Sequence, residues 1–170
     1  PVFYDKAKLV PFGEYLPFIN LKSYFKILER SNLFGWGFKR GKGSELLSLP
    51  NGLNFVPLIC YEAIFSNFLK PSVKDADFIL QITNDAWFGK SIGPQQHLAQ
   101  LRIRAIEYGL PVIRVANTGI SAIIDATGKV IKNLSVNKSG YLDSFIPSRK
   151  NSTIYGNFGN LIFLLLVFLG

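Results

Sequence analysis

The best-defined element of the sequence is a helix between two apolar strands. Gly93-Pro94 opens it, because proline suits the first helical position, and Gly109 ends it. Apolar residues recur at helical spacing and form one stripe that we expect to be buried: Leu98, Leu101, Ala105 and Tyr108. The apolar runs 77–82 and 111–116 flank this helix and read as buried strands. Alternation of strand, helix and strand predicts an α/β domain.

Shorter elements surround this unit. The runs 46–49 and 53–59 flank a Pro50-Asn51-Gly52 turn and predict a hairpin. Segments 6–17 and 83–91 read as loops, the first because its prolines and glycine forbid a continuous helix. We also expect helices at 21–30 and 63–69, and strands at 2–4, 120–125, 130–131 and 141–146. Some of the last strands should pair antiparallel.

The totals limit the classes of protein. A chain of 170 residues that is 48% hydrophobic forms one domain with a real core and is not disordered. Its net charge of +8 suits anionic phospholipid headgroups and nucleic acid equally well. One cysteine excludes an intrachain disulfide, and one cysteine with one histidine is a poor metal-ligand set. The chain begins at Pro1 and contains no methionine, so we expect it to be the C-terminal part of a longer protein.

Cys60 is the main candidate for chemistry. It ends the apolar run 55–59 and precedes a helix, and a nucleophile at a strand-to-turn junction is lifted out of the sheet. The alternative is a buried free cysteine that acts as a small apolar residue. A Cys–His pair with His97 is also open, although a structural role at the start of a helix is expected for this histidine.

A thiol needs groups that activate it. A carboxylate can act as general base, and a lysine can stabilise an oxyanion. Lys6 and Glu14 lie in the first loop, which is too rich in proline and glycine to be merely solvated. They are therefore candidates for the site.

Two other segments suggest membrane contact. An aromatic and glycine-rich stretch containing Trp36 precedes Lys39, Arg40 and Lys42. It is either a surface loop or an arm whose aromatic residues lie at the membrane interface while the cations meet lipid phosphates. Segment 161–169 consists of nine apolar residues, whereas a span needs about 20. We expect the start of a transmembrane helix; a buried core helix and an exposed strand are the alternatives.

Several motifs together carry a family resemblance, in order along most of the chain. They are Tyr4-Asp5-Lys6-x-x-Leu9-Val10-Pro11-Phe12-Gly13-Glu14-Tyr15-Leu16-Pro17, Ile59-Cys60-Tyr61-Glu62, Thr83-Asn84-Asp85-Ala86-Trp87-Phe88-Gly89, Gly93-Pro94-x-Gln96-His97, Arg104-Ala105-Ile106-Glu107-x-Gly109-x-Pro111, Asn117-x-Gly119-x-Ser121 and Ile124-Asp125-x-x-Gly128. This set resembles the bacterial apolipoprotein N-acyltransferases, membrane enzymes that carry a nitrilase-superfamily domain. The blocks around Cys60 and Trp87 distinguish that family from soluble nitrilases and amidases.

The resemblance implies a fold and a triad. Residues 1–150 would form the C-terminal part of a nitrilase-like αββα sandwich, incomplete at its N-terminus, and residues 151–170 the start of a transmembrane helix. In the Glu-Lys-Cys triad of the family, Cys60 matches the nucleophile and Lys6 the catalytic lysine. The general-base glutamate lies upstream of that lysine and has no counterpart in this sequence. We therefore expect these 170 residues alone to be inactive.

Further site residues come with the same resemblance. Glu14 matches a second glutamate near the site, and Tyr61 and Glu62 match residues that the family needs for activity. We assign Trp36, Trp87 and Asn84 to substrate binding.

The resemblance also implies a reaction. A phospholipid would donate its acyl group to Cys60, and the thioester would acylate the α-amine of the N-terminal lipid-modified cysteine of a diacylglyceryl-apolipoprotein. The partners would be membrane lipid and the apolipoprotein, without nucleic acid, cofactor or metal. The location would be the bacterial inner membrane, with the catalytic domain facing the periplasm.

Two other functions stay open. The first is a soluble carbon–nitrogen hydrolase that acts on a small amide or nitrile. The second is a truncated, catalytically dead domain that only binds lipid or a partner.

Overall fold

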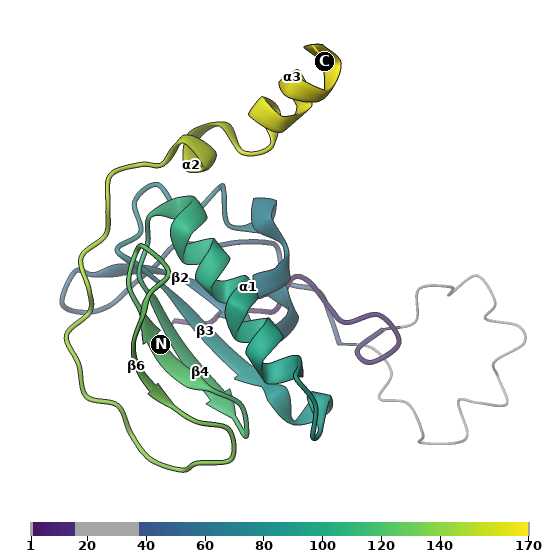
Figure 1. Ribbon diagram of the computed structural model, residues 1–170, viewed down its shortest axis with the longest axis vertical. Helices are drawn as coiled ribbons and strands as arrows, with labels where there is room; N and C mark the ends of the chain where they lie inside the picture. The colour runs from purple at the N-terminus through teal and green to yellow at the C-terminus, as the bar shows by residue number, and fades with distance from the viewer. Residues whose placement is uncertain (1, 16–37, 170) are drawn as a thin grey trace, which may run out of the picture.

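The computed structural model describes residues 2–15 and 38–169. These residues form one six-stranded mixed sheet in the order β1-β2-β3-β4-β5-β6 (Figure 1). The strands are β1 (Leu47–Ser48), β2 (Asn54–Ile59), β3 (Phe78–Asn84), β4 (Val112–Asn117), β5 (Ser121–Ile124) and β6 (Val130–Leu134). The α-helices are α1 (Gly93–Tyr108), α2 (Ile154–Phe158) and α3 (Leu161–Leu169), and the 3₁₀ helices are η3 (Cys60–Ile64), η4 (Ser66–Phe68) and η5 (Asp85–Phe88). The helix predicted at 21–30 and Trp36 lie outside the described residues.

The pairing of the strands matches the α/β prediction. β2, β3 and β4 are parallel, and α1 forms the crossover between β3 and β4. β1 pairs antiparallel with β2, as the predicted hairpin requires, and β5 and β6 add an antiparallel edge. The carboxyl ends of the parallel strands therefore meet at one edge of the sheet, where ligand sites of open α/β sheets form.

The core lies between the sheet and α1. Alternate residues of the strands point to this side, among them Val56, Leu58 and Ile79, and all are buried. Leu101 and Ala105 of α1 pack against them, as the predicted stripe requires. Gly109 has a positive φ of 64° and ends the helix, where a residue without Cβ is favoured.

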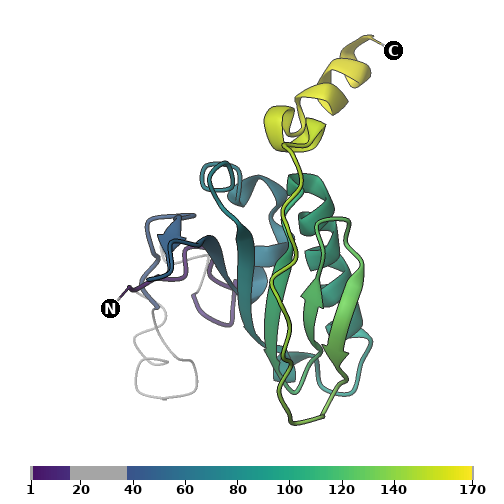
Figure 2. The ribbon, with the colours of Figure 1, turned by 90° about the vertical axis from the view of Figure 1, so that its left-hand side faces the viewer.

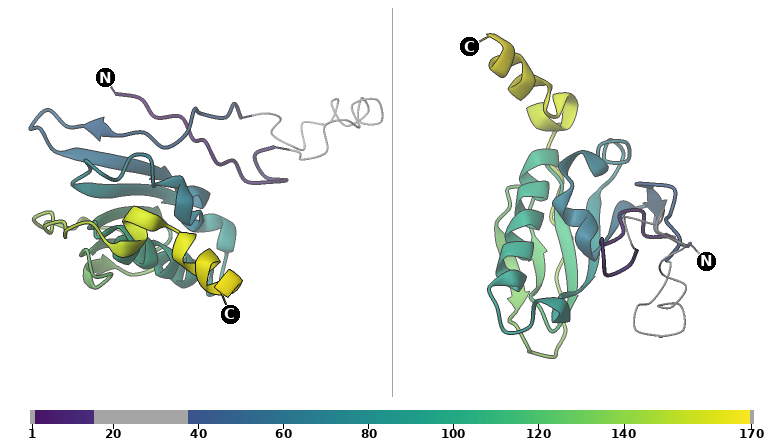
Figure 3. Two further views of the ribbon diagram at one scale, coloured as in Figure 1. Left: turned by 90° about the horizontal axis from the view of Figure 1, so that it is seen from above. Right: turned by 90° about the vertical axis from the view of Figure 1, so that its right-hand side faces the viewer.

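The other face of the sheet is covered less completely. Ile82 and Val115 are neighbours on β3 and β4, and they are 57% and 52% exposed. Figure 3 shows α1 on one side of the sheet and no helix of the described residues on the other. The described residues thus supply one sheet and one helical layer of the predicted αββα sandwich.

Two predicted strands are absent, and one predicted helix is divided. Segments 2–4 and 141–146 have no regular secondary structure and pair with no strand. Residues 138–152 instead run alongside the sheet from β6 back to α2 (Figure 2). Arg149 Nη1 donates to the carbonyls of Lys74 (3.0 Å) and Ala76 (2.6 Å). Hydrogen bonds from a side chain thus hold this segment where strand pairing was expected. The helix expected at 63–69 is broken at Phe65, whose extended backbone separates η3 from η4.

The apolar tail is helical and exposed. α3 contains nine apolar residues, none of them buried, so a buried core helix and an exposed strand are both wrong. Within residues 2–15 and 38–169, no helix has the length and apolar character needed to cross a bilayer. α2 joins the tail to the domain, because the Tyr155 ring packs edge-to-face on Tyr108 with 5.9 Å between centroids. The boundary at residue 150 and the transmembrane helix stay predictions.

Replacing the central residue of the α1 stripe should show where the stability comes from. Leu101 is fully buried, so we expect Leu101→Ala to lower the free energy of unfolding by about 2–5 kcal/mol. The matched Leu164→Ala in exposed α3 should change it by less than about 0.5 kcal/mol. Urea unfolding followed by circular dichroism measures both. Equal effects of the two variants would contradict this account of the core.

Candidate active site

Cys60 lies where β2 ends and η3 begins. Its φ is +51°, a left-handed conformation that costs a non-glycine residue on the order of 1–2 kcal/mol. The side chain is half-buried. This sharp turn places the thiol at the carboxyl edge of the parallel strands, as the sequence predicts for a nucleophile.

Glu62 lies directly behind this turn, and its carboxylate is fully buried. Oε1 accepts hydrogen bonds from the backbone N–H of Ala7 (2.7 Å) and Lys8 (3.1 Å). Oε2 accepts one from the N–H of Ile59 (2.7 Å), and the Tyr4 hydroxyl lies 3.0 Å from both oxygens. Glu62 therefore ties the N-terminal loop to the cysteine turn and leaves no oxygen free for substrate.

Two further features fix the N-terminal loop. Burial, followed by the charge of the nearby Glu62 carboxylate, raises the pKa of Tyr4 well above its usual value, so the phenol remains a donor. Gly41 N–H donates to the carbonyl of Lys6 (2.9 Å). A Cβ on Gly41 would lie only 1.9 Å from the Asp5 carbonyl oxygen, so this approach requires glycine. The loop is held from both sides.

Lys6 and Glu14 form a close ion pair. Lys6 Nζ lies 2.6 Å from Oε1 and 2.7 Å from Oε2 of Glu14, and their side chains are 12% and 22% exposed. Val10 N–H donates to Glu14 Oε2 at 2.8 Å. Both carboxylate oxygens therefore accept hydrogen bonds, and Glu14 fixes the position of the ammonium group.

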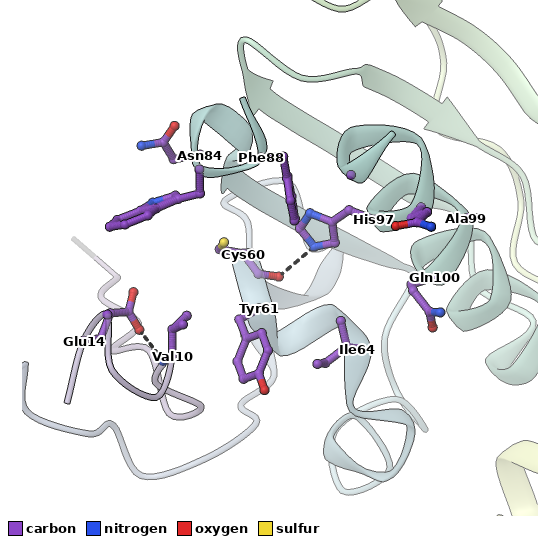
Figure 4. Close-up of a pocket in the computed structure, with 14 residues that line it drawn as sticks. Val10, Glu14, Cys60, Tyr61, Ile64, Asn84, Phe88, His97, Ala99 and Gln100 are labelled. Carbon is purple, nitrogen blue, oxygen red and sulfur yellow. Dashed lines mark hydrogen bonds between the residues drawn. The ribbon is translucent and has the colours of Figure 1, made fainter. Parts of the chain in front are cut away.

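A cavity of about 640 Å³ opens over Cys60 (Figure 4). Its wall is mainly apolar and comes from the N-terminal loop, η3, η5 and α1. The lining residues are Val10, Gly13, Glu14, Cys60, Tyr61, Ile64, Asn84, Trp87, Phe88, Gly93, Gln96, His97, Ala99 and Gln100.

The cavity brings together most of the site residues expected from the sequence. Cys60, Tyr61, Glu14, Asn84 and Trp87 all line it. Trp87 is 78% exposed at the mouth, and Asn84 caps η5 by accepting from Ala86 N–H at 3.1 Å.

Two expected site residues are not among the lining residues. Lys6 joins the cavity only through Glu14, and Glu62 lies buried behind the turn. Trp36 lies outside the described residues.

His97 of α1 is buried beside the cysteine turn. Its Nδ1 lies 3.0 Å from Asp85 Oδ1, and its Nε2 lies 3.1 Å from the backbone carbonyl oxygen of Cys60 and from Gln81 Nε2. Both ring nitrogens thus have partners other than the thiol. This geometry argues against a Cys–His pair and agrees with the structural role expected for His97.

Sequence analysis missed a buried polar network behind the site. Arg114 Nη2 donates to Asp85 Oδ2 at 2.5 Å, and Arg114 Nη1 donates to Gln81 Oε1. Thr83 Oγ1 adds a bond to Asp85 Oδ1 at 3.0 Å. Gln81 and Arg114 are register partners on β3 and β4, both on the core side. A polar residue at a core-facing strand position was the available signal.

The Asp85 carboxylate stays ionised in this network. Burial alone would raise the pKa of Asp85, but the hydrogen bond to His97 and the positive charge of Arg114 outweigh it and lower the pKa below its usual value. Burial lowers the pKa of Arg114, and the charge of Asp85 opposes this effect. In the part of the chain that the structure describes, no group of three or more His, Cys, Asp or Glu residues could hold a metal ion.

Comparison with known proteins places this site in a family. The family model for carbon-nitrogen hydrolases matches residues 3–150. The chain belongs to the carbon–nitrogen hydrolase family.

Curated relatives give a narrower resemblance. The apolipoprotein N-acyltransferase of Rhizobium rhizogenes is 47% identical over 163 residues, covering 96% of this chain and 30% of that protein. That of Rickettsia prowazekii is 45% identical, covering 95% of this chain and 32% of that protein. The expected resemblance to apolipoprotein N-acyltransferases is confirmed, and the chain spans about a third or less of the length of these relatives.

A solved structure supports the fold alone. The NitN amidase from Nesterenkonia sp. AN1 superimposes with a TM-score of 0.50 at 20% identity, covering 78% of this chain and 47% of that one. The nitrilase-like α/β fold predicted from the motifs is confirmed at this level for this member of the carbon–nitrogen hydrolase family.

The Glu62 anchor can be tested with an isosteric change. Glu62→Gln places an amide NH₂ against backbone N–H donors, so we expect a loss of about 2–3 kcal/mol in the free energy of unfolding. Asp75→Asn, which makes the same chemical change at an exposed position, should have little effect. Chemical unfolding of both variants provides the comparison. An unchanged unfolding midpoint for Glu62→Gln would show that the carboxylate does not stabilise the loop and the turn.

The ion pair between Asp85 and Arg114 should make the free energy of unfolding depend on pH in the acid range. The folded pKa lies below the unfolded value of about 3.9, so the stabilisation is complete above that value and is lost as pH falls through the folded pKa. We expect the free energy of unfolding to fall less steeply below about pH 4 in Asp85→Asn than in the wild type. Parallel curves for the two proteins between pH 6 and 2.5 would contradict this assignment.

Proposed function

We propose that this chain carries the nucleophile of a phospholipid-dependent apolipoprotein N-acyltransferase. One observation carries the proposal: Cys60, held in a sharp turn, opens into a mainly apolar cavity, in a chain 45–47% identical to proteins of that name. Relatives of this kind act on lipoproteins by name, and a fatty acyl chain is the ligand that an apolar cavity beside a thiol suits.

The first half of the reaction forms a thioester. The Cys60 thiolate attacks the ester carbonyl carbon of a phospholipid, and the carbonyl electron pair moves to oxygen. Lys6 and the Tyr61 N–H stabilise this oxyanion. The intermediate then collapses, breaks the carbon–oxygen bond and releases a lysophospholipid, whose oxygen takes the proton that the thiol gave up.

The second half transfers the acyl group. The α-amine of the lipid-modified N-terminal cysteine of an apolipoprotein attacks the thioester carbonyl, an amide forms, and the carbon–sulfur bond breaks. The proton that the amine loses goes to the departing Cys60 thiolate and restores the thiol. A thioester suits this step because it reacts with amines yet survives where water is scarce. The apolar wall formed by Val10, Ile64 and Phe88 supports such an environment.

The base that takes the thiol proton is assigned by resemblance to a glutamate outside this sequence. Glu14 does not replace it, because both of its oxygens accept hydrogen bonds from Lys6 or Val10. We therefore assign Glu14 to positioning Lys6, and Glu62 to positioning the turn. The 170 residues alone are expected to be inactive.

Exposed apolar groups support contact with a membrane. Trp87 and Ile92 lie exposed at and next to the cavity mouth, and α3 exposes nine apolar residues. Arg40 and Lys42 add exposed cations that suit lipid phosphates. We place the protein at the bacterial inner membrane, with this domain on the periplasmic side and α3 as the start of a membrane helix.

The thioester provides the direct test. The full-length protein, incubated with phospholipid but without acceptor, should gain the mass of one acyl group on the peptide that contains Cys60. Cys60→Ser should not form this thioester. Active enzyme with unmodified Cys60 would falsify the proposal.

A second arm separates the amidase alternative. The same protein incubated with a short-chain amide and water should release no ammonia above the Cys60→Ser background. Rapid amide hydrolysis without acyl transfer to an apolipoprotein peptide would instead favour a carbon–nitrogen hydrolase that acts on small amides.

A further inference from the structure

The buried network behind the site ends on the backbone carbonyl of the nucleophile. We infer that Gln81 and His97, backed by Asp85 and Arg114, are positioning residues that fix the Cys60–Tyr61 peptide. They thereby aim the Tyr61 N–H at the oxyanion. The inference rests on the proposed function only in taking Cys60 as a nucleophile that attacks an acyl carbonyl.

Gln81 holds the Cys60 carbonyl through a hydrogen bond. Its Nε2 donates to the Cys60 carbonyl oxygen at 3.1 Å. The orientation of the amide is not arbitrary, because Arg114 Nη1 donates to Gln81 Oε1, and only the amide oxygen can accept that bond. The NH₂ group therefore faces Cys60. Gln81 is fully buried, so no water competes for this contact.

His97 is the second side chain in contact with the Cys60 carbonyl. The Asp85 carboxylate at 3.0 Å from Nδ1 requires a proton on that nitrogen. Nε2 lies 3.1 Å from the Cys60 carbonyl oxygen, to which a protonated Nε2 donates, and 3.1 Å from Gln81 Nε2. The Cys60 carbonyl oxygen therefore lies 3.1 Å from a nitrogen of each of the two side chains, Gln81 and His97.

The far end of the network is packed tightly. Arg114 also donates from Nε to the Ile120 carbonyl at 2.9 Å, so its guanidinium is held on three sides. A Cβ on Gly119 would lie 2.2 Å from Asp85 Oδ2, so the chain after β4 closes directly over the carboxylate. The backbone after β4 thus contacts both side chains, Arg114 through a hydrogen bond and Asp85 through close packing.

Fixing the carbonyl also fixes the next amide. The C=O and the following N–H of a trans peptide point in opposite directions from one plane. The Cys60 carbonyl points toward His97, whereas Glu14 lies on the other side of the turn (Figure 4). The Tyr61 N–H therefore points to the Glu14 side of the cavity.

Two reactions of the same thiol separate this role from a general structural one. Attack on p-nitrophenyl butyrate forms a thioester, releases p-nitrophenolate and passes through an oxyanion. Alkylation by iodoacetamide forms a carbon–sulfur bond, expels iodide and generates no oxyanion. The ratio of the two rate constants therefore reports oxyanion stabilisation with the thiolate fraction cancelled.

The decisive variant is Gln81→Glu in the full-length protein. It keeps the side-chain size and the acceptor for Arg114 but turns a carboxylate oxygen toward the Cys60 carbonyl. We expect the ester-to-alkylation ratio to fall about 10- to 100-fold, with the alkylation rate within about twofold of wild type. Gln95→Glu makes the same change at an exposed position of α1 outside the cavity wall, and should leave both rates unchanged.

Each other outcome decides against the inference. Equal losses in both reactions would mean that the network holds the thiol itself, and no loss in either would mean that it does not act on the site. If Gln81→Glu fails to fold, His97→Asn retains a donor to Asp85 and loses the contact at Nε2. For His97→Asn we expect the ester-to-alkylation ratio to fall about 3- to 10-fold, again with the alkylation rate within about twofold of wild type.

The ester assay is independent of the natural acyl donor. A wild-type protein that gains no acyl group from phospholipid, but whose ester-to-alkylation ratio falls in Gln81→Glu, would refute the proposed function and leave the positioning role intact. A wild-type protein that gains an acyl group from phospholipid, with the same ester-to-alkylation ratio in Gln81→Glu, would support the proposed function and refute the positioning role.

Discussion

The left-handed turn at Cys60 is the constraint on which the rest of the site depends. A side chain with a Cβ does not adopt a φ of +51° without support, so neighbouring groups must hold the backbone on both sides. Glu62 accepts a hydrogen bond from the N–H of Ile59 before the turn, and Gln81 donates one to the carbonyl of Cys60 within it. Two buried side chains, neither of which is the reacting group, therefore hold the strained backbone in place.

The chemistry of these two anchors follows from the polarity of the backbone. An N–H group needs an acceptor, and the Glu62 carboxylate supplies it while also collecting two amides of the N-terminal loop. A carbonyl needs a donor, and a buried amide group supplies it only if something fixes which end faces the carbonyl. Arg114 fulfils that condition for Gln81. The same anchors therefore set the turn and bring the Lys6 loop against it.

Local patterns predicted what depends on neighbouring residues in the chain. Gly93-Pro94 and Gly109 predicted α1, the alternation of strand and helix predicted the parallel strands, and the junction at Cys60 predicted the turn that follows β2. The predictions failed where tertiary contacts decide, as for segment 141–146, which pairs with no strand and instead accepts a hydrogen bond from Lys132 Nζ at the Asp143 carbonyl. The Gln81–Arg114 network was missed because its members are distant in sequence and meet only through strand register.

Stability alone does not account for the buried Arg114–Asp85 pair. Replacing a buried ion pair with apolar residues of similar volume is often neutral or stabilising, and the surrounding core is otherwise apolar. What apolar residues cannot do is orient an amide and an imidazole toward a carbonyl. The pair lies on the α1 side of the sheet, and His97 belongs to the first turns of α1, whereas Tyr108 at its other end contacts α2. A single rigid helix of about 24 Å thus joins the cysteine turn to the base of the apolar tail (Figure 1).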